Sequence, residues 1–181
     1  MEIIISYAFA HIIEAIILWM SMSQMYEHRY KQWVTGIAIM AGHAVMFVVF
    51  LTGNIYFITA INNSMYIVLM ALMFNVSKRS AVFWALIYNA MMAISEQLVF
   101  FSTEYIIGIR HVKQEELAII IAVISLCKIV YFIFVETMVI IRNKSKAVES
   151  FDVSIVLLCF NSITYSILVS IFIGVYYILY N

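Results

Sequence analysis

Long apolar runs separated by short polar connectors dominate this sequence. The runs are 20 to 28 residues long and free of proline, and they cover residues 3–25, 33–52, 55–74, 81–103, 117–141 and 153–180. A helix needs about 20 mostly apolar residues to cross a bilayer, whereas a strand of a membrane barrel needs only about ten residues of alternating character. The pattern therefore predicts an all-α, polytopic membrane bundle with six transmembrane helices.

Composition agrees with this architecture and leaves little room for a soluble domain. Hydrophobic residues make up 66% of the 181 positions and charged residues only 11%. Six spans and their connectors use nearly the whole length, so we expect one transmembrane domain over residues 1–181. The lipid bilayer is the expected surrounding, and nucleic acid is not an expected partner because the formal net charge is zero.

The distribution of basic residues predicts how the bundle is oriented. Short cytoplasmic loops of membrane proteins carry an excess of Lys and Arg. The first, third and fifth connectors hold most of the basic residues: Arg29, Lys31, Lys78, Arg79, Arg142, Lys144 and Lys146. This bias places the N-terminus outside, and six spans would place Asn181 outside as well. We expect a multi-pass protein of a bacterial plasma membrane.

Four ionisable residues lie inside the predicted spans: Glu14, Glu96, Lys128 and Glu136. Such a group costs about 2.5–3.5 kcal/mol near a helix centre, so it should face a partner or a water-filled cavity. With a rise of about 1.5 Å per residue, Glu14 and Lys128 lie near the midplane and Glu96 about 6 Å closer to the outer side. This depth predicts that Lys128 is flanked by Glu14 and Glu96, while Glu136 extends toward the inner interface.

Polar residues recur on single faces of three predicted helices. These stripes are Asn89, Glu96 and Thr103; Ser125, Lys128 and Tyr131; and Ser154, Asn161 and Tyr165. They are expected to face one another, either as hydrogen bonds that hold the helices together or as a ligand-responsive element. We favour the second interpretation.

Catalytic and metal sites are conceivable but not expected. His11 and Glu14 share a helical face and His43 lies in the next span, yet no HExxH or Cys/His cluster is present. We therefore expect these histidines to be hydrogen-bonded within the bundle or near the membrane interface. Ser125 and Lys128 match a serine–lysine pair without its companion motifs, and no nucleotide fingerprint is present. The sequence predicts no enzyme and no cofactor.

Three segments resemble a known family of membrane sensors. They are "HIIEAIILWMSMSQMYEHRYKQ", "KRSAVFWALIYNAMMAISEQLV" and "IAVISLCKIVYFIFVETMVIIRNKSK". In order and loop charge the chain is similar to the N-terminal sensor of AgrC-like peptide-sensing histidine kinases with a GHKL domain. Glu14, the Ser95–Glu96 pair and Lys128 match recurring polar positions. The resemblance implies an extracellular peptide ligand, quorum sensing through a two-component system and a dimeric receptor.

The chain ends at Asn181 without a kinase half, so the expected function is a receptor module without catalytic activity. Its partner would be a second copy or a separate cytoplasmic output protein. The expected ligand and coupling residues are Glu14, Glu96, Lys128, Asn89, Ser125, Asn161 and Arg110, with Arg110 in an outer connector that could meet an anionic group. Two alternatives stay open: a substrate-binding subunit of an energy-coupling-factor transporter, disfavoured by the charge bias and by only 5 Gly, and an accessory protein that binds no ligand.

Overall fold

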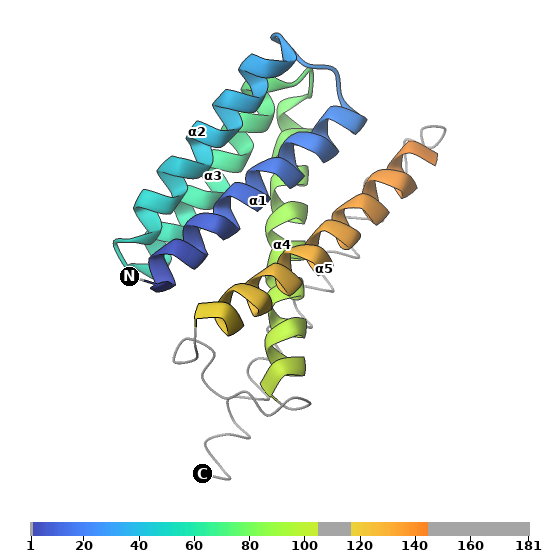
Figure 1. Ribbon diagram of the computed structural model, residues 1–181. Helices are drawn as coiled ribbons and strands as arrows, with labels where there is room; N and C mark the ends of the chain where they lie inside the picture. The colour runs from blue at the N-terminus through green and yellow to red at the C-terminus, as the bar shows by residue number, and fades with distance from the viewer. Residues whose placement is uncertain (1, 105–116, 145–181) are drawn as a thin grey trace.

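The computed structural model describes residues 2–104 and 117–144, and this part of the chain is helical (Figure 1). Its helices are α1 (Glu2–Met25), α2 (Gln32–Phe50), α3 (Ile55–Met73), α4 (Lys78–Ser102) and α5 (Leu117–Lys144). All except α3, whose apolar stretch Phe57–Met73 is shorter, are long and apolar enough to cross a membrane. The all-helical architecture is confirmed for these residues, and four of their helices are compatible with a membrane protein. The sixth predicted span, 153–180, lies outside them, so a count of six stays a prediction.

Local capping explains why some helix ends differ from the limits of the apolar runs. Helix α4 begins at Lys78 instead of residue 81, because the Ser77 side chain accepts a hydrogen bond from the Ser80 N–H. Helix α2 ends at Phe50 instead of residue 52, and Gly53 then adopts a positive φ of 71°. The Asn54 side chain caps α3 by accepting from Phe57 N–H. A polar cap therefore explains the earlier start of α4, and the turn at Gly53 follows the earlier end of α2.

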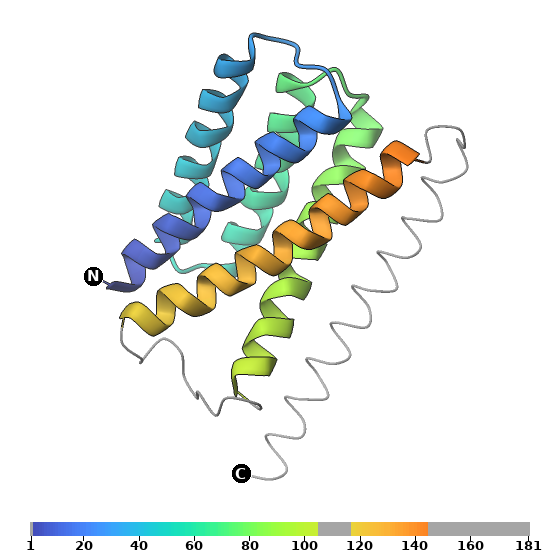
Figure 2. The ribbon, with the colours of Figure 1, turned by 45° about the vertical axis from the view of Figure 1, so that its right-hand side comes forward.

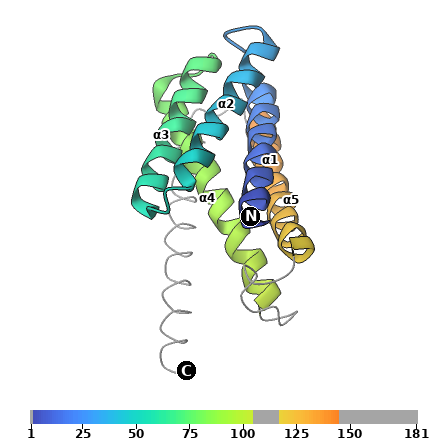
Figure 3. The ribbon, with the colours of Figure 1, turned by 60° about the vertical axis from the view of Figure 1, so that its left-hand side comes forward.

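The helices pack in a ring. The main contacts join α1 to α2, α2 to α3, α3 to α4, α4 to α5 and α5 back to α1. Figures 1 and 2 show α1 and α5 running side by side in the same direction, and Figure 3 shows α2 and α3 on the other side of the bundle. The starts of α1, α3 and α5 therefore lie at one end of the bundle with the ends of α2 and α4. We call this the N-terminal end.

Apolar packing is concentrated toward the opposite end of the bundle. The main cluster of buried side chains there includes Leu18, Met22, Met70, Phe74, Trp84, Tyr88, Val135 and Val139. These residues come from the later parts of α1, α3 and α5 and the early part of α4. Large apolar side chains such as Trp33, Ile37 and Val48 point outward, as expected where lipid replaces water. The buried charged side chains Glu14 and Lys128, in contrast, lie closer to the N-terminal end.

The opposite end is also tied together by polar contacts between connectors and helices. Backbone hydrogen bonds of 2.9 Å run from Arg29 N to Met73 O and from Asn75 N to Glu27 O. Arg142 of α5 donates to the carbonyl of Met25, and its guanidinium lies 4.2 Å from the centre of the Tyr26 ring. These contacts hold α5 against the end of α1. The two helices are therefore fixed to each other at this end of the bundle.

Candidate functional site

Three charged side chains meet where α1, α4 and α5 approach one another. Lys128 Nζ lies 2.6 Å from Glu14 Oε1 and 2.9 Å from Glu96 Oε1. The side chains of Lys128 and Glu14 are 4% and 7% exposed, whereas that of Glu96 is 39% exposed. The prediction that Lys128 is flanked by the two glutamates is confirmed. Lys128 therefore joins a buried carboxylate on α1 to a more accessible one on α4.

Helical spacing directs these groups toward the centre of the ring. On α1, Tyr7, Ala10, His11 and Glu14 follow the i, i+3, i+4, i+7 pattern of a single face. Met92, Glu96 and Phe100 recur every four residues on α4, and Ile120, Ile124, Cys127 and Lys128 share a face of α5. Each face carries apolar residues around one or two charged ones. The spacing therefore places Glu14, Glu96 and Lys128 among apolar side chains on the inner faces of the three helices.

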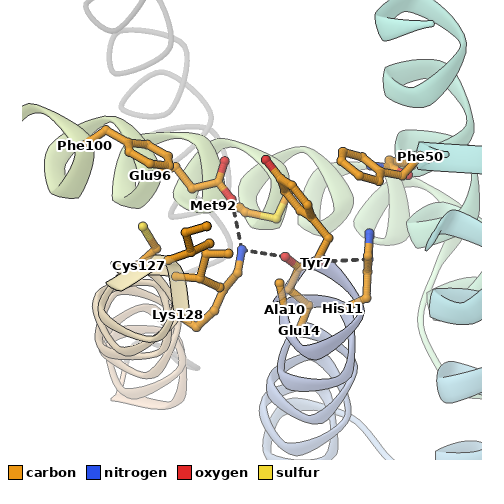
Figure 4. A pocket seen from close by; sticks show the side chains of 13 residues that line it. Tyr7, Ala10, His11, Glu14, Phe50, Met92, Glu96, Phe100, Cys127 and Lys128 are labelled. Carbon is orange, nitrogen blue, oxygen red and sulfur yellow. Dashed lines mark hydrogen bonds and ion pairs between the residues drawn. The ribbon is translucent and has the colours of Figure 1, made fainter. Parts of the chain in front are cut away.

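The three faces enclose a cavity in the N-terminal half of the bundle (Figure 4). Its volume is about 200 Å³, and residues of all the described helices line it, including Phe50 of α2 and Asn62 of α3. Figure 4 shows the Lys128 ammonium between Glu96 and Glu14, with the Tyr7 ring beside them. Ligand pockets for whole drug-sized molecules measure about 300–1,000 Å³. The cavity therefore suits one side chain or a small polar group of a larger ligand.

Two histidines meet the other oxygen of Glu14. His11 Nδ1 lies 3.4 Å from Glu14 Oε2, and His43 Nδ1 lies 3.9 Å from the same atom. His43 is only 2% exposed, yet neither of its ring nitrogens has a hydrogen-bond partner within the described part of the chain. The expectation of hydrogen-bonded histidines is therefore wrong for His43, and His11 Nδ1 also lacks a hydrogen-bond partner within the described residues. The His43 ring meets that of Tyr66 edge-on, with 5.6 Å between the ring centres.

Other predicted site residues lie away from the cavity or outside the described residues. The Asn89 amide donates to the carbonyl of Ala85 in its own helix, and the Thr103 hydroxyl likewise bonds the Val99 carbonyl. Half-buried Ser125 is not among the residues that line the cavity. Arg110 and Asn161 lie outside the described residues. Of the predicted α4 stripe of Asn89, Glu96 and Thr103, only Glu96 lines the cavity.

Glu136 occupies the position expected for a residue near the opposite end. Its carboxylate accepts hydrogen bonds of 3.0 and 3.3 Å from the Gln24 amide, at a solvent-accessible place between α1 and α5. It takes no part in the cavity. Tyr7 and Phe50 line the cavity although the sequence did not predict them, and the seven-residue spacing from Glu14 is the signal that could identify Tyr7.

Comparisons with known proteins found no matching family model, no similar curated protein and no similar solved structure. The resemblance to AgrC-like sensors therefore stays a prediction, and function has to be argued from the cavity and its charges.

Proposed function

We propose that this chain is a membrane receptor module that binds an anionic group of an apolar ligand in the cavity. The observation that carries the proposal is the unequal burial of the two partners of Lys128. Glu14 is enclosed, whereas Glu96 borders the cavity and is 39% exposed. A carboxylate that enters the cavity can take the place of Glu96 on Lys128 without adding charge to the buried centre. Glu96 is then free to turn toward water.

This exchange would weaken a contact between two helices. Lys128 holds α5 to α1 through Glu14 and to α4 through Glu96. Contacts at the opposite end keep α5 on α1, through Arg142 to the Met25 carbonyl and Glu136 to Gln24. Loss of the Glu96 contact would thus let α4 move relative to the α1–α5 pair. A ligand that binds only the displaced arrangement would shift the population toward it.

A short apolar peptide with a free carboxyl terminus fits this chemistry, in keeping with the resemblance to peptide-sensing receptors. Its carboxylate would bind Lys128, and its apolar side chains would contact Phe100 and Ile120, which line the cavity. The receptor would act on a second copy or on a separate output protein. We expect it to catalyse no reaction itself.

Fluorescence of a label at the cavity tests the proposal. In a background with Cys127→Ala and Cys159→Ala, a bimane label would be attached at Phe100→Cys, and a matched label at the exposed, non-lining Leu98→Cys. Short apolar peptides with a free carboxyl terminus would be added to the labelled protein in nanodiscs. We expect a saturable change at position 100 that is weaker for C-terminal amides and small at position 98.

Two further variants test whether the fluorescence change at position 100 depends on the contact between Glu96 and Lys128. Glu96→Gln should strengthen peptide binding, because a neutral amide competes less for Lys128, whereas Asn89→Ala on the same helix should leave it unchanged. Equal responses to acids and amides, or no saturable response at position 100 from any peptide, would contradict the proposal. The charged cluster would then serve only to hold the helices together.

A further inference from the structure

His11, Glu14 and His43 bring three potential metal ligands to one point, on the side of Glu14 that faces away from Lys128. The nitrogen and oxygen atoms of the three side chains lie within 4.8 Å of one another. We infer that these residues bind a divalent transition-metal ion, for which Zn²⁺ is the best match. Two imidazoles and one carboxylate form a ligand set that proteins use for Zn²⁺ with one position left open.

The distances allow such an ion after small side-chain movements. Zinc binds histidine nitrogen at about 2.0–2.1 Å and carboxylate oxygen at about 2.0–2.2 Å, so neighbouring ligand atoms in a tetrahedral site lie about 3.4 Å apart. His11 Nδ1 is already 3.4 Å from Glu14 Oε2. His43 Nδ1, at 3.9 Å from the same oxygen, has to approach by about half an ångström. All three ligand atoms already lie within 4.8 Å of one another, so the site closes on an ion with side-chain movements of about an ångström.

The isolation of His43 is an independent sign of a missing ligand. A neutral imidazole has one N–H donor and one acceptor nitrogen. Both nitrogens of His43 are unpaired within the described residues, although the side chain is almost fully buried. A buried polar group without a partner costs about 1–3 kcal/mol. A metal ion at Nδ1 would use the lone pair that points toward Glu14 and leave the Nε2–H beside the Tyr66 ring.

The ion would not have to displace Lys128. Lys128 Nζ bonds Oε1 of Glu14, whereas both histidines face Oε2, so the carboxylate can serve both at once. The cluster of Glu14, Glu96 and Lys128 carries a formal charge of −1, which a divalent ion changes to +1. His11 and Glu14 both line the cavity, so the open position of the ion is directed there. Hydroxide or an anionic ligand group would complete the site and neutralise it.

Metal binding is measurable without any knowledge of the physiological ligand. The full chain, purified into nanodiscs and stripped with a chelator, would be titrated with Zn²⁺ against a chromophoric competitor. Co²⁺ would report the coordination geometry through its visible absorption. We expect one equivalent of Zn²⁺ per chain and the intense bands of four-coordinate Co²⁺. His11→Gln and His43→Gln should each weaken Zn²⁺ binding at least tenfold.

His28→Gln is the matched control, because His28 lies in the connector at the opposite end of the bundle, beside Phe74. It should bind Zn²⁺ as the wild type does. Circular dichroism and gel filtration would show which variants fold; if His43→Gln does not, His11→Gln decides, since the His11 side chain is already 13% exposed. Absence of a Zn²⁺ equivalent, or equal loss in the His11 and His28 variants, would overturn the inference. Neither result depends on the proposed receptor function.

Discussion

At the scale of single residues, replacement of Lys128 should lower the stability of the bundle more than replacement of either glutamate. Lys128 compensates a buried carboxylate, Glu14, and a partly exposed one, Glu96. Removal of one member of a buried ion pair costs about 3–5 kcal/mol, mostly because an uncompensated charge stays behind. An exposed partner can be solvated instead, so its loss costs much less. The two glutamates should therefore respond differently to mutation.

We expect Lys128→Met to lower the free energy of unfolding by about 3–5 kcal/mol, measured by SDS titration in mixed micelles. Glu14→Gln should be clearly more destabilising than Glu96→Gln, because Glu14 is the enclosed partner. The double variant Glu14→Gln/Lys128→Met should recover part of the stability, since it leaves no unpaired charge on that side. Wild-type stability of Lys128→Met would show that the ion pair contributes nothing to packing.

At the scale of helices, the approach of α2 to α3 depends on Gly42. A methyl group added there would lie 2.7 Å from Leu69 Cδ1 and 3.3 Å from Leu69 Cγ, and Leu69 is buried. Gly36 on the same helix differs, because an added methyl group would meet Trp19 at an ordinary 3.5 Å. Small residues let membrane helices pack closely, so the two glycines should not be equivalent.

Gly42→Ala should therefore destabilise the bundle by about 1–3 kcal/mol, the usual cost of overpacking. Gly36→Ala should be neutral or slightly stabilising, because alanine favours the helix. Thermal unfolding of the two variants in the same detergent would compare them directly. Equal midpoints would mean that Leu69 adopts another rotamer without cost.

At the scale of the whole molecule, the ring of helices has two unlike ends. One end is closely packed and tied by connector hydrogen bonds, and the N-terminal end holds the cavity. Basic residues gather at the packed end: Arg29 and Lys31 lie in the connector between α1 and α2, and Lys78 and Arg79 lie in the first turn of α4. By the positive-inside rule we expect this end to face the cytoplasm and the cavity to lie toward the outside.

Labelling of single cysteines tests this orientation. In a background with Cys127→Ala and Cys159→Ala, a membrane-impermeant maleimide should modify Thr52→Cys in intact cells. Tyr30→Cys, in the first basic connector, should react only after the cells are made permeable. The reverse result would place the cavity on the cytoplasmic side and exclude an extracellular ligand for it.

The order of helices and the depth of their charges could be predicted from the sequence, because both depend only on position along the chain. Run lengths predicted the five described helices to within about three residues, and the rise per residue brought Glu14, Glu96 and Lys128 to similar depths. The Ser77 cap accounts for the largest difference at a helix start, the beginning of α4 at Lys78.

Only the tertiary structure decided which helix faces meet, because an apolar helix in lipid has no strongly polar side to orient it. The observed helix rotations bring both His43 and His11 close to Glu14. They leave Asn89 and Ser125 outside the cavity. They also enclose Glu14 and leave Glu96 accessible. The sequence determined which charged residues lie within the apolar helices, and the rotation of each helix determined which of them line the cavity.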